Sequence, residues 1–123
     1  MKIEVSVGEI VDKLSILDIK RQKITDPAKL ENIQREYQYL YEIVFSMLTV
    51  NIDEYNQLLL VNKKLWNIED DIRIKEKNKE FDEDFIRLAR LVYVTNDIRF
   101  EIKKVINSKY NSNFREEKSY EKY

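Results

Sequence analysis

The residues from Phe81 to Asn107 constrain the fold most strongly, because their apolar side chains cover more than one face of a helix. One set follows a spacing of three and four residues: Phe85, Leu88, Val92, Ile102 and Ile106. A second set lies on the adjoining face: Leu91, Val94, Ile98 and Val105. A helix that is apolar on two faces is normally covered by several neighbouring helices.

Four polar residues, Thr95, Asn96, Asp97 and Arg99, interrupt this apolar surface near its middle. They indicate either a break in the helix or a buried polar layer. No Gly or Pro lies between Phe81 and Asn107, so we expect one continuous helix.

Three further helical patterns precede this stretch. Ser6 and Glu9 have the spacing of a capping box, and Asp26-Pro27 is typical of a cap followed by the first helical residue. Asn51 or Asp53 is expected to cap the third helix. The helices are predicted over residues 6–24, 26–49, 53–77 and 82–108. The apolar stripe of the second comprises Leu30, Ile33, Tyr37, Leu40, Val44 and Met47.

Short connections between the four patterns favour antiparallel neighbours, so the sequence predicts an all-α fold, an up-down-up-down helical bundle. At 123 residues the chain fits a single helical domain over 1–123. A short extended segment precedes the first helix. The tail 109–123 loses helical periodicity but keeps four aromatic residues, Tyr110, Phe114, Tyr120 and Tyr123, and we expect it to dock on its own bundle or on a second subunit.

The composition excludes several kinds of chemistry. The chain has no Cys and no His, which removes thiol nucleophiles, imidazole bases and the usual zinc ligands. Its 22 basic and 23 acidic residues give a net charge of −1, so no overall field favours nucleic acid or an anionic membrane. The sequence has no 18-residue apolar run and no signal-peptide pattern, so a cytoplasmic protein without a membrane segment is expected.

Unusual polar residues gather at one end of the predicted bundle. Folding the third helix back onto the fourth near Lys79 brings Asn62 close to Asn96 and Arg99. One interpretation is a set of hydrogen-bonded pairs that fixes helix pairing. The other is a pocket for a small anion or a peptide carboxylate, formed by Lys13, Arg99 and Lys103. The candidate ligand-binding residues are Asp12, Lys13, Asn62, Asn96, Asp97, Arg99 and Lys103.

We therefore predict an interaction or scaffold protein that binds a protein partner or associates with itself, possesses no catalytic residues and needs no cofactor. A binder of small anions or phosphate ligands is the alternative. A carboxylate-metal enzyme also has to be considered, because helical nucleotide pyrophosphohydrolases hold magnesium with an E-x-x-E pair and a following E-x-x-D. Glu80 and Glu83 have the first spacing, but they flank a helix start and no E-x-x-D follows. No metal ligands are therefore assigned.

Four stretches carry a resemblance to a known family. They are V-S-V-G-E-I-V-D-K-L-S-I-L-D-I-K over 5–20, L-W-N-I-E-D-D-I-R over 65–73, T-N-D-I-R over 95–99 and R-E-E-K-S-Y over 115–120. In these the chain resembles a family of small uncharacterised bacterial and phage proteins, classed as a domain of unknown function. The resemblance implies that residues 115–120 belong to the domain, and it implies no activity.

Overall fold

Four α-helices and one π-helical turn make up most of the chain. The computed structural model describes the backbone of residues 1–123 and every side chain except that of Met47, whose predicted place in the stripe of the second helix lies outside the described residues. The elements are α1 (Val7–Lys23), α2 (Pro27–Glu42), η1 (Ile43–Met47), α3 (Ile52–Lys77) and α4 (Glu83–Lys109). No described residue lies in a β-strand. The prediction of an all-α fold is confirmed.

Side-chain caps start three of the helices where the sequence predicts them. The Glu9 N–H donates to Ser6 Oγ at 3.2 Å, the Asp53 N–H to Asn51 Oδ1 at 2.8 Å, and the Phe85 N–H to Asp82 Oδ1 at 3.0 Å. Each bond satisfies one of the amide groups that the first turn of a helix leaves without a partner. α2 begins with Pro27, whose fixed φ already suits a helix, but the side chain of the predicted cap, Asp26, accepts no capping hydrogen bond.

The predicted second helix ends in a turn of π-helix. The Leu48 N–H donates to the Ile43 carbonyl at 3.0 Å, which is the i to i+5 bond of that conformation. Phe45 of this turn meets the ring of Tyr55 on α3 edge to face, with ring centroids 5.2 Å apart. Thr49 follows with a φ of 50° and turns the chain towards α3.

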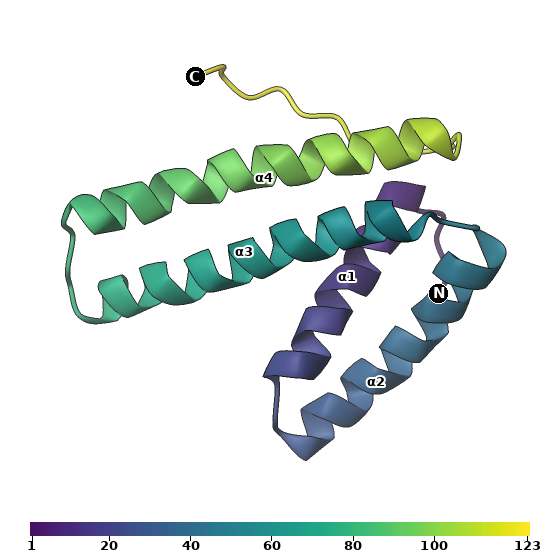
Figure 1. Ribbon diagram of the computed structural model, residues 1–123, viewed down its shortest axis with the longest axis horizontal. Helices are drawn as coiled ribbons and strands as arrows, with labels where there is room; N and C mark the ends of the chain where they lie inside the picture. Colours follow the sequence, from purple (N-terminus) through teal and green to yellow (C-terminus); the bar gives the residue numbers. More distant parts are fainter.

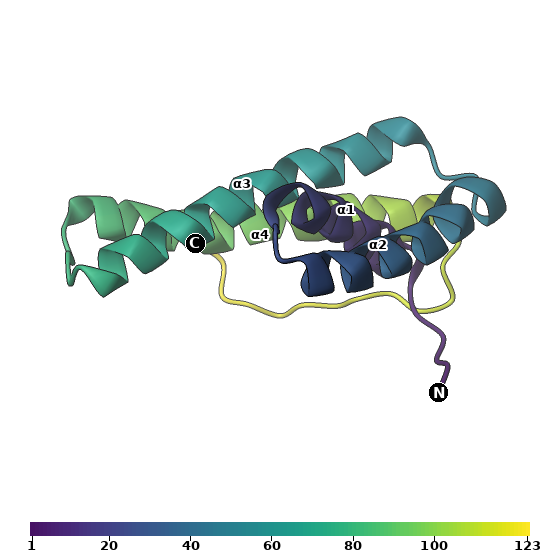
Figure 2. The ribbon, with the colours of Figure 1, turned by 90° about the horizontal axis from the view of Figure 1, so that it is seen from below.

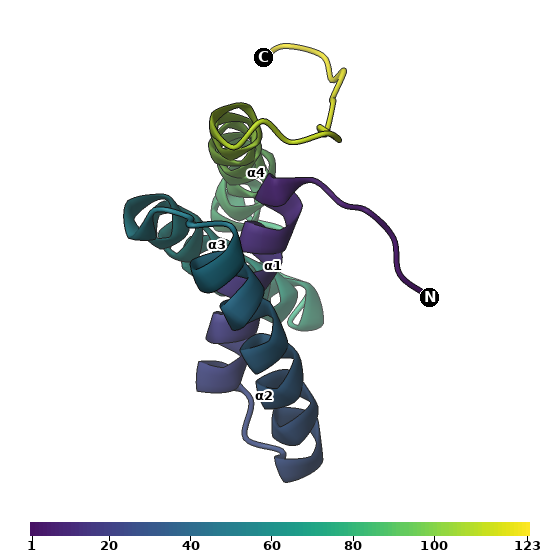
Figure 3. The same ribbon diagram turned by 90° about the vertical axis from the view of Figure 1, so that its right-hand side faces the viewer.

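The helices form two antiparallel pairs that cross each other (Figures 1 and 3). α1 and α2 make one pair, and the longer α3 and α4 make the other. The inclination between the pairs departs from the predicted bundle, in which four axes run side by side. α1 lies at the crossing and packs against α2, α3 and α4, whereas the backbone of α2 packs against α1 and η1.

The buried core lies beside this crossing and does not extend along the whole α3–α4 pair. Its members are Val11, Leu14 and Leu17 of α1, Tyr37 and Val44 from the second predicted helix, Val50, Tyr55, Leu58, Val61 and Ile106. α3 thus contributes only its first third and α4 only its last. Beyond that point the α3–α4 pair projects past α1 and α2 as a two-helix arm (Figures 1 and 2).

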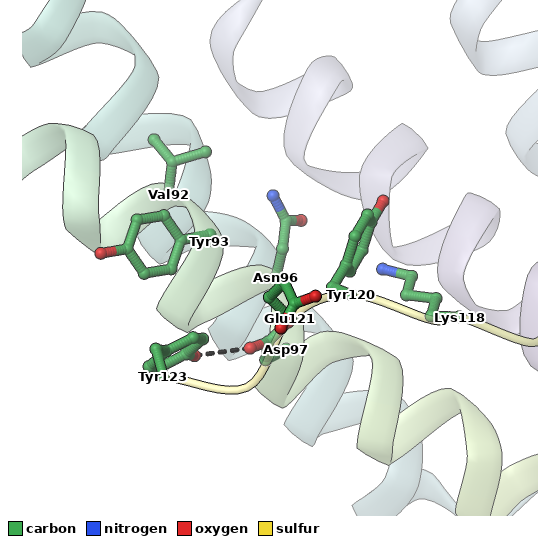
Figure 4. A pocket seen from close by; sticks show the side chains of 8 residues that line it. All are labelled: Val92, Tyr93, Asn96, Asp97, Lys118, Tyr120, Glu121 and Tyr123. Atoms are coloured by element: carbon green, nitrogen blue, oxygen red, sulfur yellow. Dashed lines mark hydrogen bonds between the residues drawn. The ribbon is translucent and has the colours of Figure 1, made fainter.

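The C-terminal tail turns at Asn111, which has a φ of 50°, and runs back along α4 (Figure 2). Tyr123 and Lys118 are among the tail residues that contact α4. Tyr123 packs edge to face on Tyr93 with centroids 5.1 Å apart and donates its hydroxyl to Asp97 (Figure 4), and the Lys118 ammonium lies 5.1 Å from the ring of Phe100. The last aromatic residue of the tail, Tyr123, therefore contacts α4 of the same chain.

Candidate functional site

A buried carboxylate, that of Asp12, lies where α1 crosses α3 and α4. The side chain is 1% exposed. Asn62 Nδ2 donates to its Oδ1 at 2.8 Å, Arg99 Nε donates to the same oxygen at 3.0 Å, and an Arg99 terminal N–H donates to Oδ2. One carboxylate thus joins three helices, which satisfies a charge that would otherwise be costly to bury.

Ser15, one turn after Asp12, completes this network. Its hydroxyl donates to the Asp12 carbonyl at 2.6 Å and accepts from Asn62 Nδ2 at 2.8 Å. The side chain of Asn62 is therefore fixed by two acceptors on α1.

Arg99 stays positively charged in this setting. The hydrogen bond to Asp12 raises the pKa of the guanidinium, burial opposes that effect, and the charges of Asp12, Glu9 and Glu116 add to it. The guanidinium is part of a fixed ion pair, so it is a poor general acid or base.

Lys103, one turn further along α4, is buried between two carboxylates. Its Nζ donates to Glu9 Oε2 of α1 at 3.0 Å and lies 3.4 Å from Glu116 Oε1 of the tail. Glu9 therefore has two roles. Its N–H donates to the cap residue Ser6, and its carboxylate holds α1 against α4. The distance from Lys103 Nζ to Glu116 is the longer of the two.

The N-terminus of α1 is bound by side chains from the far end of the chain. The Val7 N–H donates to Ser112 Oγ at 3.1 Å, and the Gly8 N–H donates to Asn107 Oδ1 at 2.7 Å. Gly8 is required by the crossing, because a Cβ at that position would lie 2.7 Å from the Lys103 carbonyl oxygen. These bonds use the amides that a helix N-terminus would otherwise offer to an anion.

Two cavities flank Arg99. The first, of about 370 Å³, lies between α1, α3 and α4 and is lined by Ile16, Ile19, Asn62, Leu65, Trp66, Glu69, Asp70, Asn96 and Arg99. The second, of about 180 Å³, lies under the tail and is lined by Glu9, Asn96, Arg99, Phe100, Lys103, Glu116 and Lys118. Arg99 and Asn96 line both. Residues from all four stretches quoted for the family resemblance thus meet around these two side chains.

The model of the Family of unknown function (DUF6165) matches residues 1–123. The chain belongs to this family. Comparison of the DUF6165 chain with curated proteins and with solved structures finds no match in either set. The functional interpretation therefore has to come from the geometry of its own residues.

The DUF6165 fold brings most of the predicted site residues together. Asp12, Asn62 and Arg99 share the hydrogen bonds described above, Asn96 lines both cavities, and Lys103 closes the smaller one. Two others lie apart. Lys13 is exposed and its Nζ lies 2.9 Å from Glu36 of α2, and Asp97 faces Tyr123 of the tail (Figure 4).

Sequence reasoning did not identify Ser15, Asn107, Ser112 or Glu116 as part of this site. Ser15 could have been found, because residues three apart share a helix face and Asp12 was a candidate. Ser112 and Glu116 lie beyond the last helix of the DUF6165 chain, where no periodicity indicates which way a side chain points.

A second polar cluster lies towards the C-terminal end of α1. Tyr55 donates its hydroxyl to Asp18 Oδ2 at 2.7 Å, and Arg21 Nε donates to Asp18 Oδ1 at 2.8 Å. Burial alone would raise the pKa of Asp18, but hydrogen bonds from Tyr55, Arg21 and Gln22 hold it below its usual range. Burial and the bond to Asp18 raise the pKa of Tyr55. This cluster joins α1 to α3.

The described part of the DUF6165 chain holds neither a cluster of metal ligands nor a membrane-spanning helix. Among the described residues, no three Asp or Glu side chains lie where they could hold a metal ion together. None of the described helices combines the length and apolar character needed to cross a membrane.

Proposed function

We propose that this chain is a helical interaction or scaffold protein that assembles with a second copy through the projecting α3–α4 pair. The observation that carries the proposal is the position of the core, which includes no residue of α3 after Val61 and none of α4 before Ile102. Two helices alone can bury only the stripes that face each other. In the arm Ile68 and Leu88 are buried between the two helices, whereas Ile74 and Ile98 are exposed.

The exposed apolar residues form a defined outer face, on the side of α3–α4 away from α1. A groove of about 620 Å³ runs along it, lined by Gln57, Leu60, Val61, Lys63, Lys64, Asn67, Ile98 and Ile102. Leu60 is 73% exposed and Ile98 is 48% exposed. Ile74 and Val105, each seven residues from a groove position, continue the same faces at 56% and 58% exposure.

The charges along this arm favour an antiparallel second copy. Lys63 and Lys64 rim the groove near the crossing. Glu83 and Asp84 lie in the first turn of α4, at the tip of the arm. The distance along α3 from Lys63, near the crossing, to Lys77, at the end of the helix, is about 21 Å, because a helix rises 1.5 Å per residue. The last turn of α3, at the same tip, also carries Lys75 and Lys77. A two-fold axis across the arm would place Lys63 and Lys64 of one copy near Glu83 and Asp84 of the other, the self-complementary arrangement of a symmetric dimer.

The polar network supports an architectural role over catalysis. The Asp12 carboxylate and the Arg99 guanidinium bind each other, and the Lys103 ammonium is bound by Glu9. Paired and hydrogen-bonded charges of this kind fix how helices meet. α1 is thereby held across the base of the arm, which leaves the outer face open to a partner.

Multi-angle light scattering during size exclusion tests the proposal. The wild-type chain should elute at twice its 15.0 kDa mass at tens of micromolar concentration. Leu60→Lys combined with Ile98→Lys should shift it to the monomer, because two charges would be buried in the interface. Ile86→Lys is the control and should leave the mass unchanged. Ile86 lies on α4 as Ile98 does and has a similar exposure, but it lies seven residues from Tyr93 and so on the face of that residue.

A salt titration and a charge reversal examine the antiparallel arrangement. Lys63→Glu with Lys64→Glu should weaken the dimer, and adding Glu83→Lys with Asp84→Lys should restore it. A wild-type chain that stays at 15.0 kDa at high concentration would refute self-association. A dimer insensitive to the outer-face substitutions would place the interface elsewhere and overturn the proposal as well.

A further inference from the structure

The cavity of about 180 Å³ under the tail is small and strongly polar. Three cations line it, Arg99, Lys103 and Lys118, together with the carboxylates of Glu9 and Glu116. Pockets for organic ligands are usually about 300–1,000 Å³, so this cavity suits a group of a few atoms.

The two carboxylates in this cavity are held in different ways. Glu9 belongs to α1 and lies 3.0 Å from Lys103 Nζ. Glu116 belongs to the extended tail, and its two oxygens lie 3.4 and 3.5 Å from the same nitrogen. Charge-assisted hydrogen bonds are usually 2.7–2.9 Å long, so the Glu116 contact is the weaker one and its carboxylate is the one that can leave.

The charges of the cavity are balanced only with Glu116 in place. Asp12 and Glu9 face Arg99 and Lys103, and Lys118 lies over the rings of Phe100 and Tyr120. Without Glu116, three cations face two carboxylates, which leaves one positive charge in a partly open cavity.

We propose that this cavity binds a small oxyanion, a carboxylate or a phosphate group, which takes the place of the Glu116 carboxylate beside Lys103 and binds to Lys103 and Arg99. Glu116 is then an internal competitor. The ligand enters as the tail around Glu116 lifts from α4, and the site closes again when the ligand leaves.

The contacts of the tail are consistent with such a local opening. Arg115 Nε donates to the Ser112 carbonyl at 3.2 Å, on one side of Glu116. Lys118 over Phe100 and Tyr123 on Asp97 hold the other side. Residues 113–123 form no helix, so moving Glu116 breaks no ladder of backbone hydrogen bonds.

The experiment compares the wild-type chain with Glu116→Gln, using inorganic phosphate and acetate as separate probes at constant ionic strength. The binding constants are measured by NMR titration of the backbone amides. A tethered competitor acts at an effective concentration of about millimolar or more, so its removal should tighten the binding of at least one probe by about tenfold. The shifts should concentrate at Lys103, Arg99 and residues 115–118.

Two further variants keep the result interpretable. Glu117→Gln removes the same charge from the neighbouring exposed position and should bind as the wild type does. Lys103→Met in the Glu116→Gln background should abolish binding while the helical circular dichroism is retained. If Lys103→Met does not fold, Lys118→Met, which removes the exposed cation of the cavity, should weaken binding at least threefold.

Equal affinity of Glu116→Gln and the wild type for both probes would overturn the proposal, as would shifts confined to exposed lysines outside the cavity. Preference for acetate or for phosphate decides which oxyanion the site takes. The outcome is independent of self-association, because the cavity lies under the tail and the outer face lies on the other side of α3–α4.

Discussion

Asp12 and Arg99 bind each other through both carboxylate oxygens, 87 residues apart in the chain. The pair connects the helix at the crossing to the middle of the longest helix. Because the Asp12 side chain is buried and that of Arg99 is 27% exposed, loss of the arginine would leave the more costly charge behind.

Arg99→Met should therefore lower the free energy of unfolding by about 3 kcal/mol. Combined with Asp12→Asn, the loss should be smaller than the sum of the two single effects by about 1–3 kcal/mol. Urea unfolding of the four proteins gives this coupling. Arg90→Met on the exposed side of α4 is the control and should stay within about 0.5 kcal/mol of wild type. Additive single effects would contradict an energetic role for the pair.

Gly8→Ala should destabilise the fold although alanine favours helices. Its methyl group would meet the Lys103 carbonyl oxygen at 2.7 Å and Asn107 Oδ1 at 3.0 Å, and a backbone oxygen cannot move aside cheaply. Overpacking of this kind costs about 1–3 kcal/mol, against a gain in helix propensity of about 1 kcal/mol. Chemical denaturation measures the balance. A more stable Gly8→Ala protein would mean that α1 and α4 approach less closely than described.

Thr95→Val should be neutral or stabilising by up to about 1 kcal/mol. Thr95 is fully buried in the middle of α4, and within the described part of the chain its hydroxyl has no hydrogen-bond partner. Replacing that hydroxyl by a methyl group removes a desolvated polar atom and keeps the shape. Thr95→Ser keeps the hydroxyl and loses the methyl, so it should cost about 1 kcal/mol. Thermal melting of the two variants distinguishes these effects, and a strongly destabilised Thr95→Val protein would indicate a bound partner for the hydroxyl.

Asp18 should make stability depend on acid pH. Its pKa in the folded chain lies below the ordinary value of 3.8, so the unfolded chain takes up a proton first as the pH falls. The stabilisation is therefore complete well above pH 3.8, and it is lost as the pH drops through the folded pKa. Unfolding free energies measured from pH 6 to about pH 2 should fall less steeply for Asp18→Asn than for wild type. Parallel curves for the two proteins would contradict this assignment.

Helical periodicity and end signals were sufficient to anticipate the helices, including the uninterrupted α4 across Thr95 to Asp97, because these are local properties of the chain. The inclination of the two pairs was not anticipated. It includes a close approach of α1 to α4, which Gly8 permits because a Cβ there would meet the Lys103 carbonyl oxygen. For the polar contacts, the sequence predicted which residues lie near each other but not which atoms they bind. Folding α3 onto α4 brings Asn62 near Arg99, but it cannot indicate that both bind a carboxylate on α1.

The first helix of this chain is completed by residues from the end of α4 and the segment that follows it. Val7 and Gly8 donate to Ser112 and Asn107, 105 and 99 positions later. During synthesis α1 therefore emerges long before the groups that bind its N-terminus are made. The α3–α4 pair, whose contacts are local, can form while α1 and α2 wait, because short loops close faster than long ones. The newly made chain therefore cannot reach its native state until translation has passed Ser112, and a stalled ribosome would hold α1 in an unfinished, protease-sensitive form.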